Sequence, residues 1–250
     1  MPGCSHDRPG WSHPGGVAPR PGRLVSWCPT DLGAPIRTRS GFALPFPLST
    51  MDASPTRRRS SSQIREQIVA QVLSLLWEHP LRDITVKMIM EGTGLSRPSF
   101  YIHFNSIPEL IEERLAELEE VMIGTTIQWL SSADDDPGTL RTALDGLIRV
   151  VAENGATFRA IAEAATLDAQ LATTWGDFMA KWDVGVANRI RAGQELGYVP
   201  DIDAERTAFA LNRMNATVFI EAFGKRPQQP TEPVIEATFQ IWKRTLYGSD

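Results

Sequence analysis

Apolar positions recur at helical spacing along almost the whole chain after residue 60. In the first such segment, residues 60 to 79, they fall at steps of three and four: Ile64, Ile68, Val72, Leu75 and Leu76. This spacing predicts an amphipathic helix that starts at Ser60 and ends near Pro80. Thr85 then caps a short second helix, and the "GTG" at 92–94 supplies the turn that stops it. A third helix of about seven residues begins at Ser96, with proline in its first turn, where a missing N–H is harmless.

Longer periodic segments follow. Residues 107–131 predict one long helix that ends at "DDDPG", and further helices are expected at 138–154, 156–166, 168–196, 203–223 and 231–247. Asn-Gly, glycine and proline separate these segments. We find no convincing strand and no heptad run. The predicted fold class is all-α.

The first fifty residues have a different composition. They contain half of the eighteen prolines and seven glycines, but no lysine, no glutamate and no helical period. Such a segment cannot bury enough apolar surface to fold, so we expect residues 1–55 to form a disordered tail. Met51 opens a segment that resembles a natural start, and we hypothesise that the preceding residues come from an upstream start assignment. Both cysteines lie here, so packing alone must hold the rest of the chain.

Charge is distributed unevenly along the chain, although the formal net charge is only −5. Residues 55–105 hold seven Arg or Lys against four Asp or Glu, whereas residues 109–136 hold nine acids against one arginine. Positive potential is therefore concentrated on the first three helices. No stretch approaches the roughly 18 apolar residues that a membrane span needs. We expect a cytoplasmic protein.

The segment around the glycine turn predicts a helix-turn-helix, in which the second helix enters the major groove of DNA. Phe100 and Phe104 are four residues apart and, with Leu95, can anchor the short helix. The opposite side presents groups suited to bases and phosphates: Arg97, Pro98, Ser99, Tyr101 and His103. The basic run Arg57, Arg58 and Arg59 precedes it as an arm. Taken alone, a short aromatic helix after a glycine turn is more often a packing element.

Residues 85–110, "TVKMIMEGTGLSRPSFYIHFNSIPEL", closely resemble the DNA-binding segment of TetR-family transcriptional regulators. The resemblance implies that Thr85 and Tyr101 contact phosphates and that His103 lies at the backbone or a base edge. It implies that bases are faced by Arg97, Pro98 and Ser99. One residue departs from the pattern: Ile107 stands where the family usually has a lysine. We therefore expect a DNA-binding domain at 56–106 and a ligand-binding and dimerisation domain at 107–248.

The segments "TWGDFMAKW", "ALNRMNATVF" and "IWKRTLYG" resemble the second domain of the mycobacterial regulators of ethionamide activation, a branch of that family. The resemblance implies an apolar pocket lined by Leu140, Leu147, Val151, Trp175, Met179, Trp182, Asn212, Asn215 and Trp242. The first three stand where the relative has larger aromatic residues. From spacing alone, the tryptophans form an ordinary core stripe. The asparagines either bond between helices or bind a ligand.

The resemblance further implies a homodimer through helices 203–223 and 231–247 on a palindromic DNA operator. The apolar residues of these helices include Phe219, Phe223, Ile235, Phe239, Ile241, Trp242 and Leu246. The predicted function is a transcriptional repressor released by an apolar small molecule. The alternative is a DNA-binding regulator without a small-molecule ligand.

An enzyme is disfavoured because the chain after residue 50 has only two histidines, no cysteine and no phosphate loop. We expect no cofactor, and no metal at residues 134–136.

Overall fold

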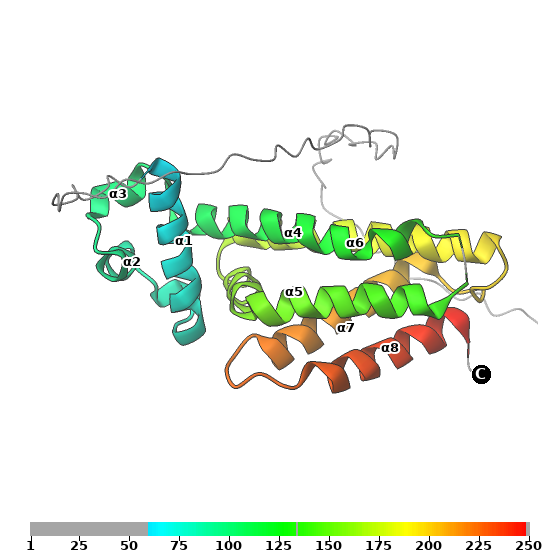
Figure 1. Ribbon diagram of the computed structural model, residues 1–250. Coiled ribbons are helices and arrows are strands. Elements are labelled where there is room, and N and C mark those ends of the chain that lie inside the picture. The colour runs from blue at the N-terminus through cyan, green and yellow to red at the C-terminus, as the bar shows by residue number, and fades with distance from the viewer. Residues whose placement is uncertain (1–59, 134, 249–250) are drawn as a thin grey trace, which may run out of the picture. The chain divides into compact units, whose positions relative to one another are not determined.

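A computed structural model describes residues 60–133 and 135–248, and the regular structure in these ranges is entirely helical (Figure 1). The predicted all-α class is confirmed. The helices are α1 (Ser61–Glu78), the 3-10 turn η1 (Leu81–Asp83), α2 (Val86–Thr93), α3 (Arg97–Tyr101), α4 (Ile107–Ser131), α5 (Pro137–Ala164), α6 (Ala169–Glu195), α7 (Ala204–Phe223) and α8 (Thr231–Tyr247). None of the helices in these ranges is long and apolar enough to cross a membrane. The predictions for residues 1–55, Met51 and the arm Arg57, Arg58 and Arg59 lie outside the described residues.

Local side-chain caps set the first helix boundaries. Ser60 Oγ accepts the backbone N–H of Gln63, whose side chain accepts the backbone N–H of Ser60. Thr85 Oγ1 accepts the N–H of Met88 at 3.3 Å, as expected for the start of α2. The helix ends at Gly94, whose φ of 69° lies in the left-handed region that glycine adopts without a Cβ penalty. The predicted start and stop of α2 are therefore confirmed.

Helices α4 to α8 form what we call the body of the chain. Helix α4 packs against α5 and α6, α6 packs against α7, and α5 also packs against α7 and α8. The predicted break at Asn154-Gly155 is confirmed as a kink that divides α5 into two helical parts. Helix α5 continues through a kink at Asn154, whose φ of −119° and ψ of 18° are not helical. A Cβ on Gly155 would lie 2.1 Å from the carbonyl oxygen of Phe223. Glycine is needed there because α5 and the end of α7 approach closely.

The inner faces of α7 and α8 belong to the core of the chain itself. Five of the apolar residues expected on the dimer helices are buried within the chain: Phe219, Phe223, Ile235, Trp242 and Leu246. They are unavailable to a partner because α7 packs on α5 and α6, and α8 packs on α5 and α7. The apolar residues of these helices that remain exposed are Phe209, Val218 and Ile241. Most of the apolar residues that the sequence places on these two helices therefore belong to the core of the chain itself.

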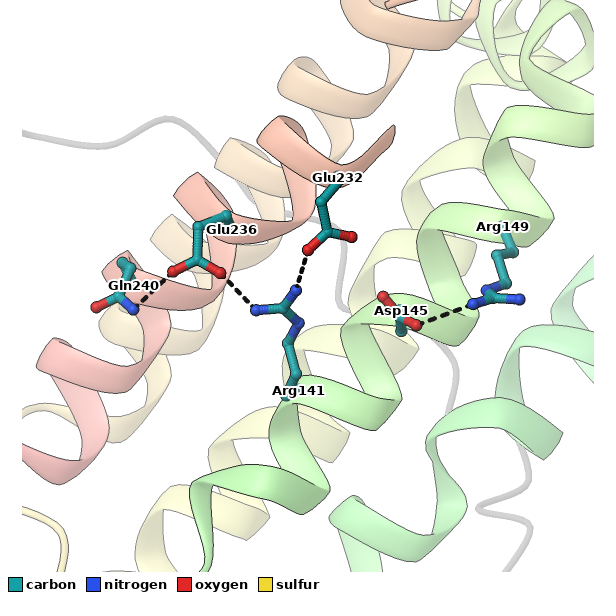
Figure 2. Close-up of polar contacts among 6 residues, drawn as sticks. All are labelled: Arg141, Asp145, Arg149, Glu232, Glu236 and Gln240. Carbon is teal, nitrogen blue, oxygen red and sulfur yellow. Dashed lines mark hydrogen bonds and ion pairs between the residues drawn. The ribbon is translucent and has the colours of Figure 1, made fainter. Parts of the chain in front are cut away.

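An arginine on α5 joins that helix to α8 at the surface (Figure 2). The guanidinium of Arg141 donates to Glu236 at 2.5 Å and to Glu232 at 2.6 Å. Gln240 donates to the other oxygen of Glu236 at 2.9 Å. These two hydrogen bonds, first that of Gln240 and then that of Arg141, hold the pKa of the Glu236 carboxyl below its usual value.

Replacing Arg141 with Gln is expected to lower the melting temperature slightly at neutral pH and to reduce its acid dependence. A carboxyl with a lowered folded-state pKa stabilises the fold above its unfolded pKa, and that contribution is lost as pH falls through the folded pKa. The difference in melting temperature between wild type and variant should therefore shrink below about pH 4. Thermal melts across this range test the prediction. Arg149→Gln is the matched control, since Arg149 pairs with Asp145 within α5 (Figure 2). A difference that stays constant with pH would contradict it.

Candidate DNA-binding surface and core cavity

The short helix α3 is anchored by its aromatic side. Phe100 and Phe104 are both buried, with ring centroids 5.7 Å apart. The guanidinium of Arg65, from α1, lies 4.9 Å from the centre of the Phe104 ring and also pairs with Glu113 of α4. Arg65 of α1 therefore contacts both Phe104, in the turn after α3, and Glu113 of α4. This packing determines which side of α3 faces outward.

The outward side of α3 carries most of the residues predicted to meet DNA. Arg97, Pro98 and Tyr101 are exposed, and Ser99 and His103 are half-buried. Thr85 is exposed at the start of α2, where its hydroxyl oxygen already serves as the cap. The structure thus places all six described members of the predicted set at the start of α2, along α3 and in the turn after it.

Sequence reasoning missed one side chain of this surface. Ile102, directly after α3, is 77% exposed and lies beside Tyr101, which is 60% exposed. Its position, two residues from each of the buried phenylalanines, was a signal that it faces outward. Ile107, where the resemblance implies a lysine, is half-buried and packs against the core, so it presents no cation.

A small apolar cavity of about 60 Å³ lies inside the helical body. A second space of about 20 Å³ adjoins it, and the two share four lining residues: Leu147, Trp182, Asn212 and Asn215. The other predicted lining residues divide between them, with Val151, Trp175 and Met179 at the larger cavity and Leu140 and Trp242 at the smaller. All nine predicted residues are therefore brought together around this pair of cavities, which we call the core cavities.

Six further side chains line the larger cavity although the sequence did not predict them as lining: Met122, Phe158, Phe178, Ala216, Phe219 and Ile220. Phe178 stacks on Trp175 with centroids 5.3 Å apart and meets Trp182 edge-on at 6.2 Å. The aromatic stripe of α6 therefore forms a wall of the cavity as well as part of the core.

Both asparagines make hydrogen bonds between helices. Asn212 Nδ2 donates to Asp183 Oδ1 at 2.9 Å, and Asn215 Oδ1 accepts from Trp242 Nε1 at 2.9 Å. Asp183 also pairs with Arg213. Within the described ranges, Asn212 Oδ1 and Asn215 Nδ2 form no hydrogen bond, so each asparagine retains one polar atom beside the cavity.

The indole nitrogen of Trp182 is the polar group of this cavity that most needs an explanation. Trp182 Nε1 is buried and has no hydrogen-bond acceptor among the described residues. A buried donor without a partner costs free energy, and native structures contain few of them. The cavity therefore combines apolar walls with two N–H donors, those of Trp182 and Asn215, that an acceptor group can satisfy.

The fold defines a helix-turn-helix protein whose DNA-binding segment is joined to a helical body with an apolar cavity. The family model for the transcriptional regulator EthR, C-terminal domain, matches residues 140–248. The transcriptional regulator EthR of Mycobacterium tuberculosis is 30% identical over 201 residues, which cover 78% of this chain and 92% of that protein. EthR of Mycolicibacterium smegmatis is 29% identical over 203 residues, covering 78% and 94%. The TetR family transcriptional regulator PfmR from Thermus thermophilus has the same fold, with a TM-score of 0.59, 19% identity and coverage of 73% and 98%.

These relatives and the fold together establish what kind of protein this is. The chain belongs to the EthR family of helix-turn-helix transcriptional regulators, and its fold is that of TetR-family regulators. Its similarity to EthR extends over both the DNA-binding segment and the body. These relatives are named as regulators of transcription.

Proposed function

We propose that the chain is a repressor that binds a palindromic DNA operator as a homodimer and is released when an apolar small molecule enters the core cavity. The observation that carries the proposal is that Trp182, which lines an apolar cavity, has a buried indole N–H without an acceptor among the described residues. A mostly apolar site with a few polar anchors is how small-molecule sites are built.

The DNA contact is assigned to the outward side of α3. An arginine at the start of this helix can donate two hydrogen bonds to guanine, and Arg97 is exposed at that position. Thr85, Tyr101 and His103 are assigned to the phosphate backbone around it. The exposed Ile102 adds an apolar group that can meet a thymine methyl. The arm of Arg57, Arg58 and Arg59 belongs to this proposal on sequence alone.

The expected ligand is elongated, mostly apolar and carries one hydrogen-bond acceptor such as a carbonyl. The larger core cavity, of about 60 Å³, has room for only a few water molecules, since each occupies about 30 Å³ of liquid. A larger ligand must therefore displace side chains. Trp182 borders both cavities, so its movement joins them, and Met122 and Met179 can adapt their flexible side chains.

The response follows from linkage between two binding events. DNA selects one arrangement of the two helix-turn-helix segments in the dimer, the ligand selects another, and each weakens the other's affinity equally. A coupling of about 1–3 kcal/mol gives a 5- to 150-fold response. Helix α4 runs from the DNA-binding segment to Met122 in the cavity wall and is the proposed lever.

The dimer is assigned to α7 and α8, as in the sequence-based prediction. The exposed apolar residues available there are Phe209, Val218 and Ile241. A two-fold dimer presents two copies of α3 and so requires a palindromic operator.

Replacing Trp182 with Phe tests the ligand site, because it removes the indole donor and keeps an aromatic ring. For a compound selected by thermal shift from elongated carbonyl-containing molecules, we expect affinity to fall about 3- to 10-fold, the worth of one hydrogen bond. Operator affinity should not change. Trp175→Phe, in the same wall, is the control and should affect the ligand less. If ligand and operator affinity fell together, Trp182 would be structural, and if no compound released DNA, the ligand-free alternative would gain support.

A further inference from the structure

A larger cavity, of about 340 Å³, lies where the DNA-binding segment joins the body. One wall comes from the connection between α1 and α2, including Leu81 and Ile84, and a second from Ile107 at the start of α4. The third comes from the end of α5 and the start of α6, including Ala164 and Leu171. We call this space the joint cavity. It shares no lining residue with the two core cavities.

The two carboxylates around the joint cavity already accept hydrogen bonds. Asp168 Oδ1 accepts the backbone N–H groups of Gln170 and Leu171 at 2.9 and 3.0 Å, as the cap of α6. Glu163 accepts both of its hydrogen bonds from Arg159. Arg82 lies 3.8 Å from Asp83. The surface left for a ligand is therefore mainly aliphatic.

Several walls of the joint cavity are formed by core side chains. Leu81, Ile84, Ala160 and Leu171 are buried side chains of the core, whereas Leu167 is 74% exposed and leaves a route in from solvent. Well-packed proteins contain few voids larger than a water molecule. An apolar space of this size that opens to solvent is suited to a small molecule.

We propose that the joint cavity is a second small-molecule site, which binds a neutral, mostly apolar compound of about the size of a bicyclic aromatic. The ligand is neutral because the two carboxylates at the walls already accept hydrogen bonds and the Arg82 side chain is largely exposed to solvent. Its walls belong to both the DNA-binding segment and the body, so occupancy holds these two parts in the arrangement of this structure. Binding here is independent of the proposed function of the core cavity.

The test uses the full chain with isoleucine methyl groups labelled for NMR and indole as the probe. Ile84 and Ile107 report on the joint cavity, and Ile220 reports on the core cavity. We expect saturable shifts of the Ile84 and Ile107 methyl signals at millimolar indole, with a single dissociation constant. Shifts confined to Ile220, or shifts that rise linearly without saturation, would overturn the proposal.

Two variants locate the binding. Ala164→Phe fills the joint cavity and is expected to weaken indole binding by at least about tenfold, whereas Ala216→Phe fills the core cavity and should leave it unchanged. If Ala164→Phe does not fold, Leu167→Asp serves instead, because it places a charge at the exposed mouth without disturbing the core. Undiminished binding to a folded form of either joint-cavity variant would also exclude the site.

Discussion

Replacing Arg159 with Met is expected to lower the free energy of unfolding by about 2–5 kcal/mol, because two buried carbonyl groups lose their donors. Arg159 is a buried residue of α5. Its Nη2 donates to the carbonyl oxygen of Leu76 at 2.5 Å, and its Nε donates to that of Gly224 at 2.9 Å. One side chain thus connects the end of α1, the middle of the body and the end of α7.

The sequence around Leu76 explains why this arginine is needed. In a continuing helix, the Leu76 carbonyl would accept the N–H of residue 80, but that residue is Pro80, which has none. Arg159 supplies the missing donor from another helix. The third partner, Glu163, is solvent-exposed, so losing its ion pair with Arg159 adds little to the loss of stability.

Urea unfolding followed by circular dichroism measures the effect. Arg149→Met is the control, since Arg149 lies on the same helix with its side chain 74% exposed and should change stability by less than about 0.5 kcal/mol. Equal stability of the two variants would show that Arg159 is not a structural link.

Replacing Arg97 with Ala is expected to weaken operator binding by about 1–3 kcal/mol, which is roughly 5- to 150-fold, and to relax the preference for one base pair. The residue is exposed at the first position of α3, while Phe100 holds the other side of that helix in the core. The change therefore removes a contact without disturbing the fold.

Fluorescence anisotropy at fixed salt, with a DNA fragment selected by the wild-type protein from a random library, measures this loss. Arg149→Ala removes the same charge outside the DNA-binding segment and is the control. A uniform loss across all DNA sequences would reassign Arg97 to a phosphate, and unchanged affinity would remove it from the interface.

Much of the core cavity was predictable because short segments carry both its residues and a family resemblance. Trp175 and Trp182 are about two helical turns apart, and Asn212 and Asn215 are almost one turn apart. Their hydrogen-bond partners were not predictable. Asp183 and Trp242 come from other helices, and nothing in the local pattern of α7 selects them.

The sequence by itself determined the helical class and most helix boundaries, because caps, prolines, glycines and the 3.6-residue period act within a few residues of each other. The bounds of α4 and α8 agree with those predicted from the sequence. Only the tertiary structure decided which apolar faces of α7 and α8 are buried, that Gly155 lies against the end of α7, and that Arg159 reaches Leu76 across 83 residues. These features depend on contacts between distant segments, and such contacts exist only after the helices have packed together.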